Sequence, residues 1–143
     1  MKAQIVAAVA LLLTGYAAGR ASSAPVLASQ PAGTHVYELR TYTAAEGKLP
    51  SVLSRFRDHT RQIFDRHHIR SVGYWTPLEG PTADTTLVYL LEHPSREEAR
   101  TNWAAFGADP EWQKAKAESE AAGRIVLKVE SVFLSPADFS PMK

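Results

Sequence analysis

Three polar side chains that could act on a ligand stand at alternate positions, namely Glu38, Arg40 and Tyr42. The run 35–42 around them is rich in β-branched and aromatic residues, which predicts a β-strand. Because side chains alternate between the faces of a strand, a carboxylate, a guanidinium and a phenol share one face with Val36. The opposite face can lie under a helix and carries Tyr37, Leu39 and Thr41.

The arginine of this polar row supports two interpretations. Arg40 could bind an anion or a carbonyl group and polarise a substrate oxygen. Alternatively, it could pair with Glu38 and Glu130 in a buried ionic network that sets the register of two sheets. The second interpretation has the broader basis, because a buried arginine needs a counter-charge whether or not a ligand is present.

Three aromatic residues complete the candidate ligand-binding set. Tyr42, Tyr89 and Trp75 could line a pocket for a flat molecule, or they could fill an interface between two sheets. Alternation alone leaves open the face on which Trp75 lies, because the register of its strand is not fixed by the sequence. Trp103, Phe106 and Trp112 recur at helical spacing and are interpreted as core residues.

Several chemistries lack the residues they need. His59 and His67 are separated by about 12 Å along a helix axis, too far to share a metal ion. The chain has no cysteine, so it offers no thiolate nucleophile and no cysteine ligand for zinc. It also has no Gly-x-Ser-x-Gly sequence and no glycine-rich phosphate loop. We therefore predict neither a metal site nor a cofactor.

The first 28 residues have the layout of a secretory signal peptide. Met1 and Lys2 give a short positive start, 5–13 is apolar, and small residues follow. The apolar run is shorter than the roughly 20 residues of a membrane span, so no stable span is expected after cleavage. Residues 29–34 read as linker, 35–135 as one domain and 136–143 as a tail without periodicity.

Charge gives little reason to expect a nucleic-acid partner. Cleavage would remove Lys2 and Arg20 and leave 14 basic against 15 acidic side chains. Nucleic-acid-binding domains are normally basic, with their cations gathered on one surface. A nearly neutral domain without a basic cluster is therefore predicted to bind no nucleic acid.

Periodicity and capping signals predict the order strand, helix, strand, strand, helix, strand. The strands are expected at 35–43, 69–75, 85–93 and 125–134, and the helices at 48–68 and from residue 95 onward. Ser95 and Glu98 have capping-box spacing, while Asp109 and Pro110 restart the second helix after Gly107. This order predicts an α+β ferredoxin-like fold with a four-stranded antiparallel sheet, in which the first and third strands are central.

Such a sheet has helices on one face only, and the other face needs a cover. We expect this bare face to carry Val36, Tyr42, Leu87, Tyr89, Leu91 and Val132. A face this apolar would be buried in a twofold-symmetric homodimer. The dimer would then enclose the polar residues Glu38, Arg40, Tyr42, Tyr89, Lys128 and Glu130 between two sheets.

Five short segments in this order resemble the NIPSNAP domain. They are ELRTY at 38–42, GYW at 73–75, LVYLL at 87–91, WAAF at 103–106 and DPEW at 109–112. The resemblance runs from Val36 to Leu134, nearly the whole domain. It implies a dimeric α/β barrel. Barrels of that superfamily include monooxygenases acting on aromatic polyketides, haem-binding peroxidase-type proteins and stress-responsive proteins.

The resemblance leaves three functional hypotheses, because the NIPSNAP family has no settled reaction. The first is a barrel that binds a small aromatic, carbonyl or carboxylate molecule near Glu38, Arg40, Tyr42, Trp75, Tyr89 and Glu130. The second is a non-catalytic dimeric module for protein interactions, and the third is a cofactor-independent monooxygenase-like enzyme. Animal members are associated with mitochondria, whereas the signal-like start of this chain predicts export to a periplasmic or extracellular location.

The export prediction can be checked on protein purified from the native host. Mature protein should begin between residues 22 and 29, because signal cleavage could follow Ala21, Ala24 or Ala28. Intact-mass measurement on the periplasmic or secreted fraction decides the point. A full-length species found only in the cytosol would contradict the prediction.

Overall fold

The computed structural model describes residues 35–142. The predicted signal segment, 1–28, and the predicted linker, 29–34, lie outside the described residues, as does Lys143. Within the described part of the chain, no helix is both long enough and apolar enough to cross a membrane.

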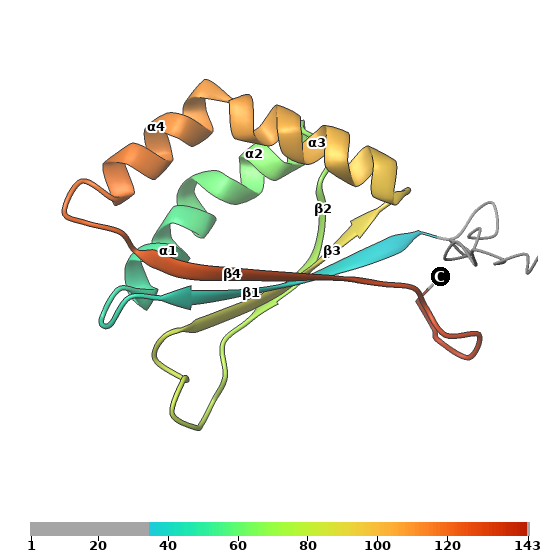
Figure 1. Cartoon of the computed structure of the whole chain (residues 1–143), viewed down its shortest axis with the longest axis horizontal. Coiled ribbons are helices and arrows are strands. Elements are labelled where there is room, and N and C mark those ends of the chain that lie inside the picture. Colours follow the sequence, from blue (N-terminus) through green and yellow to red (C-terminus); the bar gives the residue numbers. More distant parts are fainter. Residues whose placement is uncertain (1–34, 143) are drawn as a thin grey trace, which may run out of the picture.

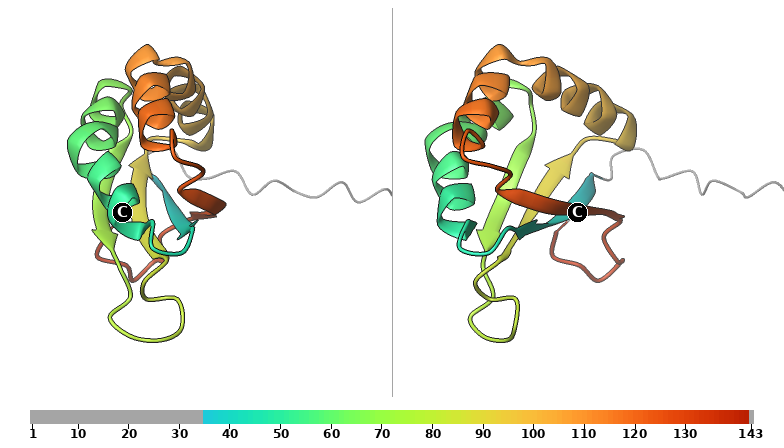
Figure 2. Two further views of the ribbon diagram at one scale, coloured as in Figure 1. Left: turned by 90° about the vertical axis from the view of Figure 1, so that its left-hand side faces the viewer. Right: turned by 60° about the vertical axis from the view of Figure 1, so that its left-hand side comes forward.

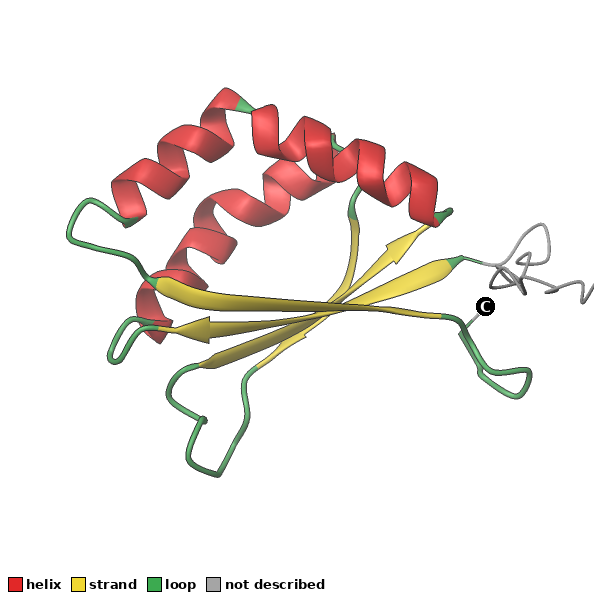
Figure 3. Ribbon diagram, in the orientation of Figure 1, coloured by secondary structure: helices red, strands yellow, loops and turns green. Residues whose placement is uncertain are grey.

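The sheet has the predicted topology. Its strands are β1 (Val36–Ala44), β2 (Arg70–Trp75), β3 (Thr86–His93) and β4 (Val126–Leu134). They are ordered β2-β3-β1-β4 and all pair antiparallel, with β1 and β3 in the centre as expected. The helices lie together on one side of this sheet (Figures 1 and 3).

The first helical segment lies where the sequence predicts it, but a π-helical turn interrupts it. It consists of α1 (Leu49–Arg55), η1 (Phe56–Thr60) and α2 (Arg61–Arg66). The Thr60 hydroxyl donates to the Arg55 carbonyl oxygen at 3.2 Å inside this turn. A π turn holds one residue more than an α turn, so it changes which side chains on either side of it face the sheet.

The second helical segment starts and restarts at the predicted caps. It comprises α3 (Arg96–Ala108) and α4 (Pro110–Ser119), which arch over the sheet (Figure 2). The Ser95 hydroxyl accepts from the backbone nitrogen of Glu98 at 3.1 Å, which confirms the expected N-cap of α3. The Asp109 carboxylate caps α4 by accepting from the backbone nitrogens of Glu111, at 2.8 Å, and Trp112, at 3.3 Å.

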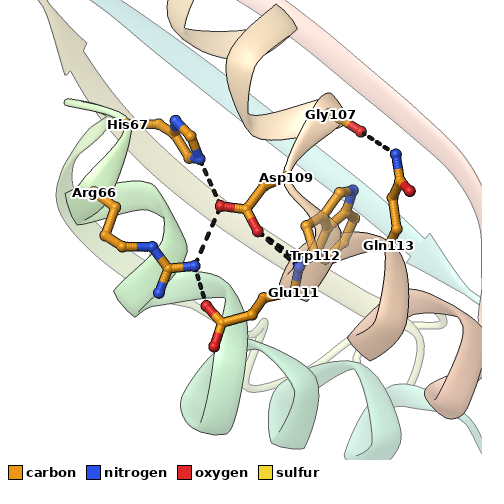
Figure 4. A network of polar contacts seen from close by, with 7 residues as sticks. All are labelled: Arg66, His67, Gly107, Asp109, Glu111, Trp112 and Gln113. Atoms are coloured by element: carbon orange, nitrogen blue, oxygen red, sulfur yellow. Dashed lines mark hydrogen bonds and ion pairs between the residues drawn. The ribbon is translucent and has the colours of Figure 1, made fainter.

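Asp109 also ties the α3–α4 junction to the end of α2 (Figure 4). Its second oxygen lies 2.7 Å from Nε2 of His67 and accepts from Arg66 at 3.2 Å, while Arg66 also pairs with Glu111. The His67 hydrogen bond is the largest influence on the Asp109 pKa and holds it below its usual range, with further lowering by Arg66. The junction therefore fixes how α4 leaves α3, and with it the position of Trp112.

The expectation about which face of the sheet is bare was wrong for five of six residues. Strand pairing places Glu38 opposite Leu91, Arg40 opposite Tyr89 and Tyr42 opposite Leu87. The Tyr42 ring meets Phe56 of the π turn edge-on at 5.6 Å, so this set faces the helices. Five residues expected on the bare face thus lie on the helix-covered one: Val36, Tyr42, Leu87, Tyr89 and Leu91.

The bare face is made by the alternate residues of each strand. It carries Leu39, Thr41, Val88, Leu90, Trp75, Glu130, Val132 and Leu134. Val132 alone was assigned there correctly, with 54% of its surface exposed. Alternation divides each strand into two sets but does not say which set the helices cover. Both sets here mix apolar and polar residues, so composition could not decide between them.

The C-terminal segment covers one corner of the bare face. Residues 135–142 turn back beside the sheet, and most of them line, with Tyr37, Leu90 and Leu134, an open groove of about 380 Å³. Phe139 nevertheless remains 89% exposed. The segment therefore leaves most of the apolar side chains of the bare face in contact with solvent.

Candidate functional site

Glu38 is the centre of a buried polar cluster between the sheet and α3. Only 1% of its surface is exposed, and its carboxylate takes part in four side-chain hydrogen bonds. One oxygen accepts from Arg40 at 2.7 Å and from the Ser131 hydroxyl at 2.6 Å. The other accepts from the Trp103 indole at 2.7 Å and lies 3.0 Å from Nε2 of His93. The predicted Glu38–Arg40 pair is therefore present, within a single chain.

The partners of Glu38 come from four different elements. Arg40 lies on the same strand, Ser131 lies opposite Arg40 on β4, and His93 ends β3 on the face that also carries Leu91. Trp103 lies on α3 and donates its indole N–H to the carboxylate, so this residue of the sheet-facing side of α3 makes a polar contact as well as an apolar one. The cluster thus links both central strands, one edge strand and a helix.

These contacts set the ionisation of Glu38. Burial removes water from the carboxylate and raises its pKa, but hydrogen bonds from His93, Ser131 and Trp103 and the charge of Arg40 outweigh burial, lowering the pKa to about 2. Glu38 is thus a carboxylate at physiological pH and a poor general base. Because its pKa lies below that of an unfolded glutamate, it stabilises the fold above about pH 4.5, and this contribution is lost as pH falls towards 2.

Next to Glu38, two buried groups have unused hydrogen-bonding capacity. The Arg40 guanidinium stacks 4.2 Å from the Trp103 ring centroid, and its Nε has no hydrogen-bond partner within residues 35–142. The Tyr89 hydroxyl likewise has no partner of good hydrogen-bond geometry in this part of the chain, while Tyr42 and Arg40 lie close enough to influence its pKa. Burial raises the pKa of Tyr89 well above its ordinary value, so the phenol is neutral. Both groups adjoin Tyr42, whose ring lies 5.3 Å from that of Tyr89.

Tyr42 also forms part of the wall of a cavity between the sheet and α4. The cavity has a volume of about 220 Å³. Its apolar and aromatic wall consists of Tyr42, Trp112, Val126 and Val129. Its charged wall consists of Arg55, Lys116, Glu120 and Arg124. The lining therefore offers flat apolar surfaces as well as charged groups, and the Arg55 guanidinium adjoins the Trp112 ring at 5.2 Å.

Arg55 is the buried member of the charged wall. Only 4% of its surface is exposed, and Nη1 donates to the Ser119 hydroxyl and to Glu120, each at 3.2 Å. Its guanidinium lies 5.2 Å from the Trp112 ring centroid, and Nε has no partner among the described residues. The periodicity of the helix expected at 48–68 predicts Arg55 on its outer, solvent-facing side, and the burial of Arg55 shows that this prediction is wrong. It is the last residue before the π turn, and no sequence pattern marks that turn.

The structure divides the six predicted site residues into two groups. Glu38, Arg40, Tyr42 and Tyr89 lie together on the helix-covered face, not between two sheets as expected. Trp75 and Glu130 lie on the bare face, so they belong to no site with the other four. Glu130 stands opposite Thr41 and pairs with the exposed Lys128 at 2.8 Å, which excludes the expected pair with Arg40. The ring of Trp75, which is 53% exposed, lies over Gly73, where a Cβ would come within 2.6 Å of it.

Sequence reasoning missed His93, Trp103 and Ser131 in the cluster and, in the cavity, every lining residue except Tyr42. His93 could have been found, because alternation along β3 places it on one face with Tyr89 and Leu91. Ser131 follows in the same way from its register with Arg40. The helical spacing of Trp103 predicted a core residue and gave no indication of its hydrogen bond to Glu38. Among the described residues no group of three or more metal-ligating side chains could hold a metal ion.

A four-stranded antiparallel sheet in the order β2-β3-β1-β4, with its helices on one face, defines an α+β ferredoxin-like domain. The sequence model of the NIPSNAP family matches residues 37–141, and the chain belongs to that family. The resemblance noted from the five short segments is thereby confirmed. No curated protein matches the chain in sequence.

Solved structures agree with this assignment. A NIPSNAP family protein with unknown function from Agrobacterium tumefaciens is 26% identical, with a TM-score of 0.66 over 77% of this chain and 95% of that one. An uncharacterised NIPSNAP domain protein from Burkholderia xenovorans is 28% identical, with a TM-score of 0.63 over 74% and 98%. A Streptomyces coelicolor monooxygenase, solved with the ligand Nanaomycin D, shares the fold at 16% identity, with a TM-score of 0.51 over 77% and 94%.

The Glu38 cluster predicts a large difference between two glutamates of the same sheet. Glu38→Leu leaves the half-buried Arg40 without its counter-ion and should lower the free energy of unfolding by about 3 kcal/mol. Glu130→Leu removes only an exposed pair and should change it by less than about 1 kcal/mol. Urea denaturation of both variants measures the difference, and equal losses would contradict the central role of Glu38.

Proposed function

We propose that the chain binds a small organic molecule, aromatic or bearing a carbonyl or carboxylate group, between its sheet and α4. The observation that carries this proposal is the set of buried groups around Tyr42 that have no partner within residues 35–142. They are Nε of Arg55, which lines the cavity, and Nε of Arg40 and the hydroxyl of Tyr89, whose side chains adjoin Tyr42 without lining the cavity themselves. Buried polar groups are nearly always hydrogen-bonded, so unpaired ones beside a cavity indicate a place for a ligand or for ordered water.

The size of the cavity limits the ligand. Sites for drug-sized molecules usually measure roughly 300–1,000 Å³, and this cavity has about 220 Å³. It can accept a single substituted ring more readily than a fused ring system. Tyr42 and Trp112 supply flat surfaces on which such a ring could pack.

Binding is proposed without an assigned reaction. The alternative of a cofactor-independent monooxygenase is supported only by the fold shared with the Streptomyces coelicolor enzyme, and a shared fold does not establish a shared reaction. Glu38 remains ionised and fully hydrogen-bonded, so it serves to position Arg40 rather than to transfer protons. Arg40, Tyr42 and Tyr89 are the groups that an enzymatic role would have to use.

We also propose that the protein is an exported homodimer joined through the bare face of the sheet. That face exposes 54% of Val132, 53% of Trp75 and 40% of Leu134, with Leu39 and Leu90 between them. Apolar side chains gathered on one face indicate a partner surface, and a second copy of the same face would match them. The alternative of a non-catalytic interaction module shares this dimer and would be favoured if the cavity bound no small molecule.

Ligand binding can be tested by filling the cavity. Val129→Trp places an indole against Tyr42 and should abolish binding of small aromatic compounds detected by ligand-observed NMR with wild-type protein. Leu127→Trp is the matched control, because Leu127 lies on the same strand, is similarly exposed and does not line the cavity. Binding that survives Val129→Trp, or that Leu127→Trp abolishes equally, would place the ligand elsewhere.

The dimer can be tested by charging each face of β4 in turn. Val132→Asp buries an unpaired charge in the proposed interface, at a cost on the order of several kcal/mol, so sedimentation velocity should show a monomer. Val129→Asp changes the same residue type on the opposite face and should leave the dimer intact. A dimer that persists in the Val132 variant would show that the bare face is not the interface.

A further inference from the structure

The charged wall of the cavity carries an excess of positive charge that the described residues, 35–142, do not neutralise. Arg55, Lys116 and Arg124 face a single carboxylate, Glu120, which gives the wall a net charge of +2. Glu120 is already engaged, since it accepts a hydrogen bond from Arg55 at 3.2 Å. The cavity therefore has unused capacity for an anionic group.

We infer that the ligand is an aromatic carboxylate, whose carboxylate binds at Arg55, Lys116 and Arg124 while its ring packs against Tyr42 and Trp112. This inference rests on the proposed function and names the class of molecule that the cavity takes. It goes beyond the general proposal in fixing both the charge of the ligand and the residues that each end contacts, with the anionic end at Arg55, Lys116 and Arg124 and the ring at Tyr42 and Trp112.

Arg55 is suited to anchor such a group. It is the buried cation of the wall, and Ser119, Glu120 and the face of Trp112 hold its guanidinium in place. The Nε of this guanidinium has no hydrogen-bond acceptor among residues 35–142. A guanidinium held in advance loses little freedom on binding a carboxylate, and its planar donors fit the two oxygens.

Lys116 and Arg124 differ from the other cations of this region. Neither forms an ion pair with any residue in the part of the chain that the structure describes, whereas Lys114 on the same helix pairs with Glu118 at 3.9 Å. Both side chains are exposed, so they can approach a ligand at the cavity mouth without breaking an existing contact. They would add attraction that weakens with ionic strength.

The apolar and aromatic wall explains why the anion should be aromatic rather than inorganic. Tyr42, Trp112, Val126 and Val129 offer no charge, and an ion such as phosphate would leave this surface unused. A ring would bury it, and aromatic pairs add about 0.5–1.5 kcal/mol beyond the area they bury. The two walls together therefore favour a molecule with one apolar and one anionic end.

Isothermal titration with benzoate and benzamide tests the inference, because these probes share a ring and differ in charge. Wild-type protein should bind benzoate more tightly than benzamide by at least about tenfold. The double variant Lys116→Met/Arg124→Met should lose on the order of tenfold in benzoate affinity and leave benzamide unaffected. Both positions are exposed, so the fold should be unchanged, and Lys114→Met is the matched control that should bind benzoate normally.

Other results of these titrations would contradict the carboxylate, the aromatic ring or binding itself. Equal affinity for benzamide and benzoate, with both blocked by Val129→Trp, would overturn the carboxylate inference and leave the proposed binding function standing. Displacement of benzoate by inorganic phosphate at equal concentration would overturn the aromatic part. Absence of binding by either probe would overturn the inference and the proposed function together.

Discussion

The structure depends on the hydrogen bonding of one buried carboxylate. Glu38 lies in the central strand β1, and Arg40, His93, Trp103 and Ser131 all converge on it. A buried charge is tolerable only when it is paired and its lone pairs are satisfied. The cluster therefore fixes the position of Arg40 beside Tyr42 and holds α3 against the sheet. Through Arg40, the Glu38 carboxylate thus influences the position of Tyr42, a lining residue of the cavity.

The positions of Arg55 and Trp112 in the cavity depend on two irregularities in the helices. The π turn that begins after Arg55 separates that arginine from the regular periodicity of α1, and Arg55 ends up buried against α4. The Asp109 junction sets the start of α4 and, through it, the position of Trp112. A regular helix in either place would present different side chains to Tyr42. Departures from ideal helices often occur at functional sites for this reason.

The fold could be predicted from the sequence because local signals agree with one another. Ser95 and Asp109 cap the helices where their spacing predicts, and β1 and β3 are central as the element order requires. The site could be predicted only in part. Alternation brought Glu38, Arg40, Tyr42 and Tyr89 to one face, but the covering of that face depends on Trp103 and Phe56, which lie far away in sequence. Arg55 was beyond prediction, since its burial depends on the π turn.

The order of the strands has a consequence for how the chain folds. β1 is first in the sequence and central in the sheet, yet it pairs with β3 and with β4, the last element. Ser131, which bonds Glu38, is separated from it by 93 residues. Contacts between residues so far apart in sequence tend to form late and to slow folding. The entropic cost of closing the long intervening chain comes before the contacts can stabilise the fold. A nascent chain therefore cannot complete this sheet until almost all of it has been synthesised.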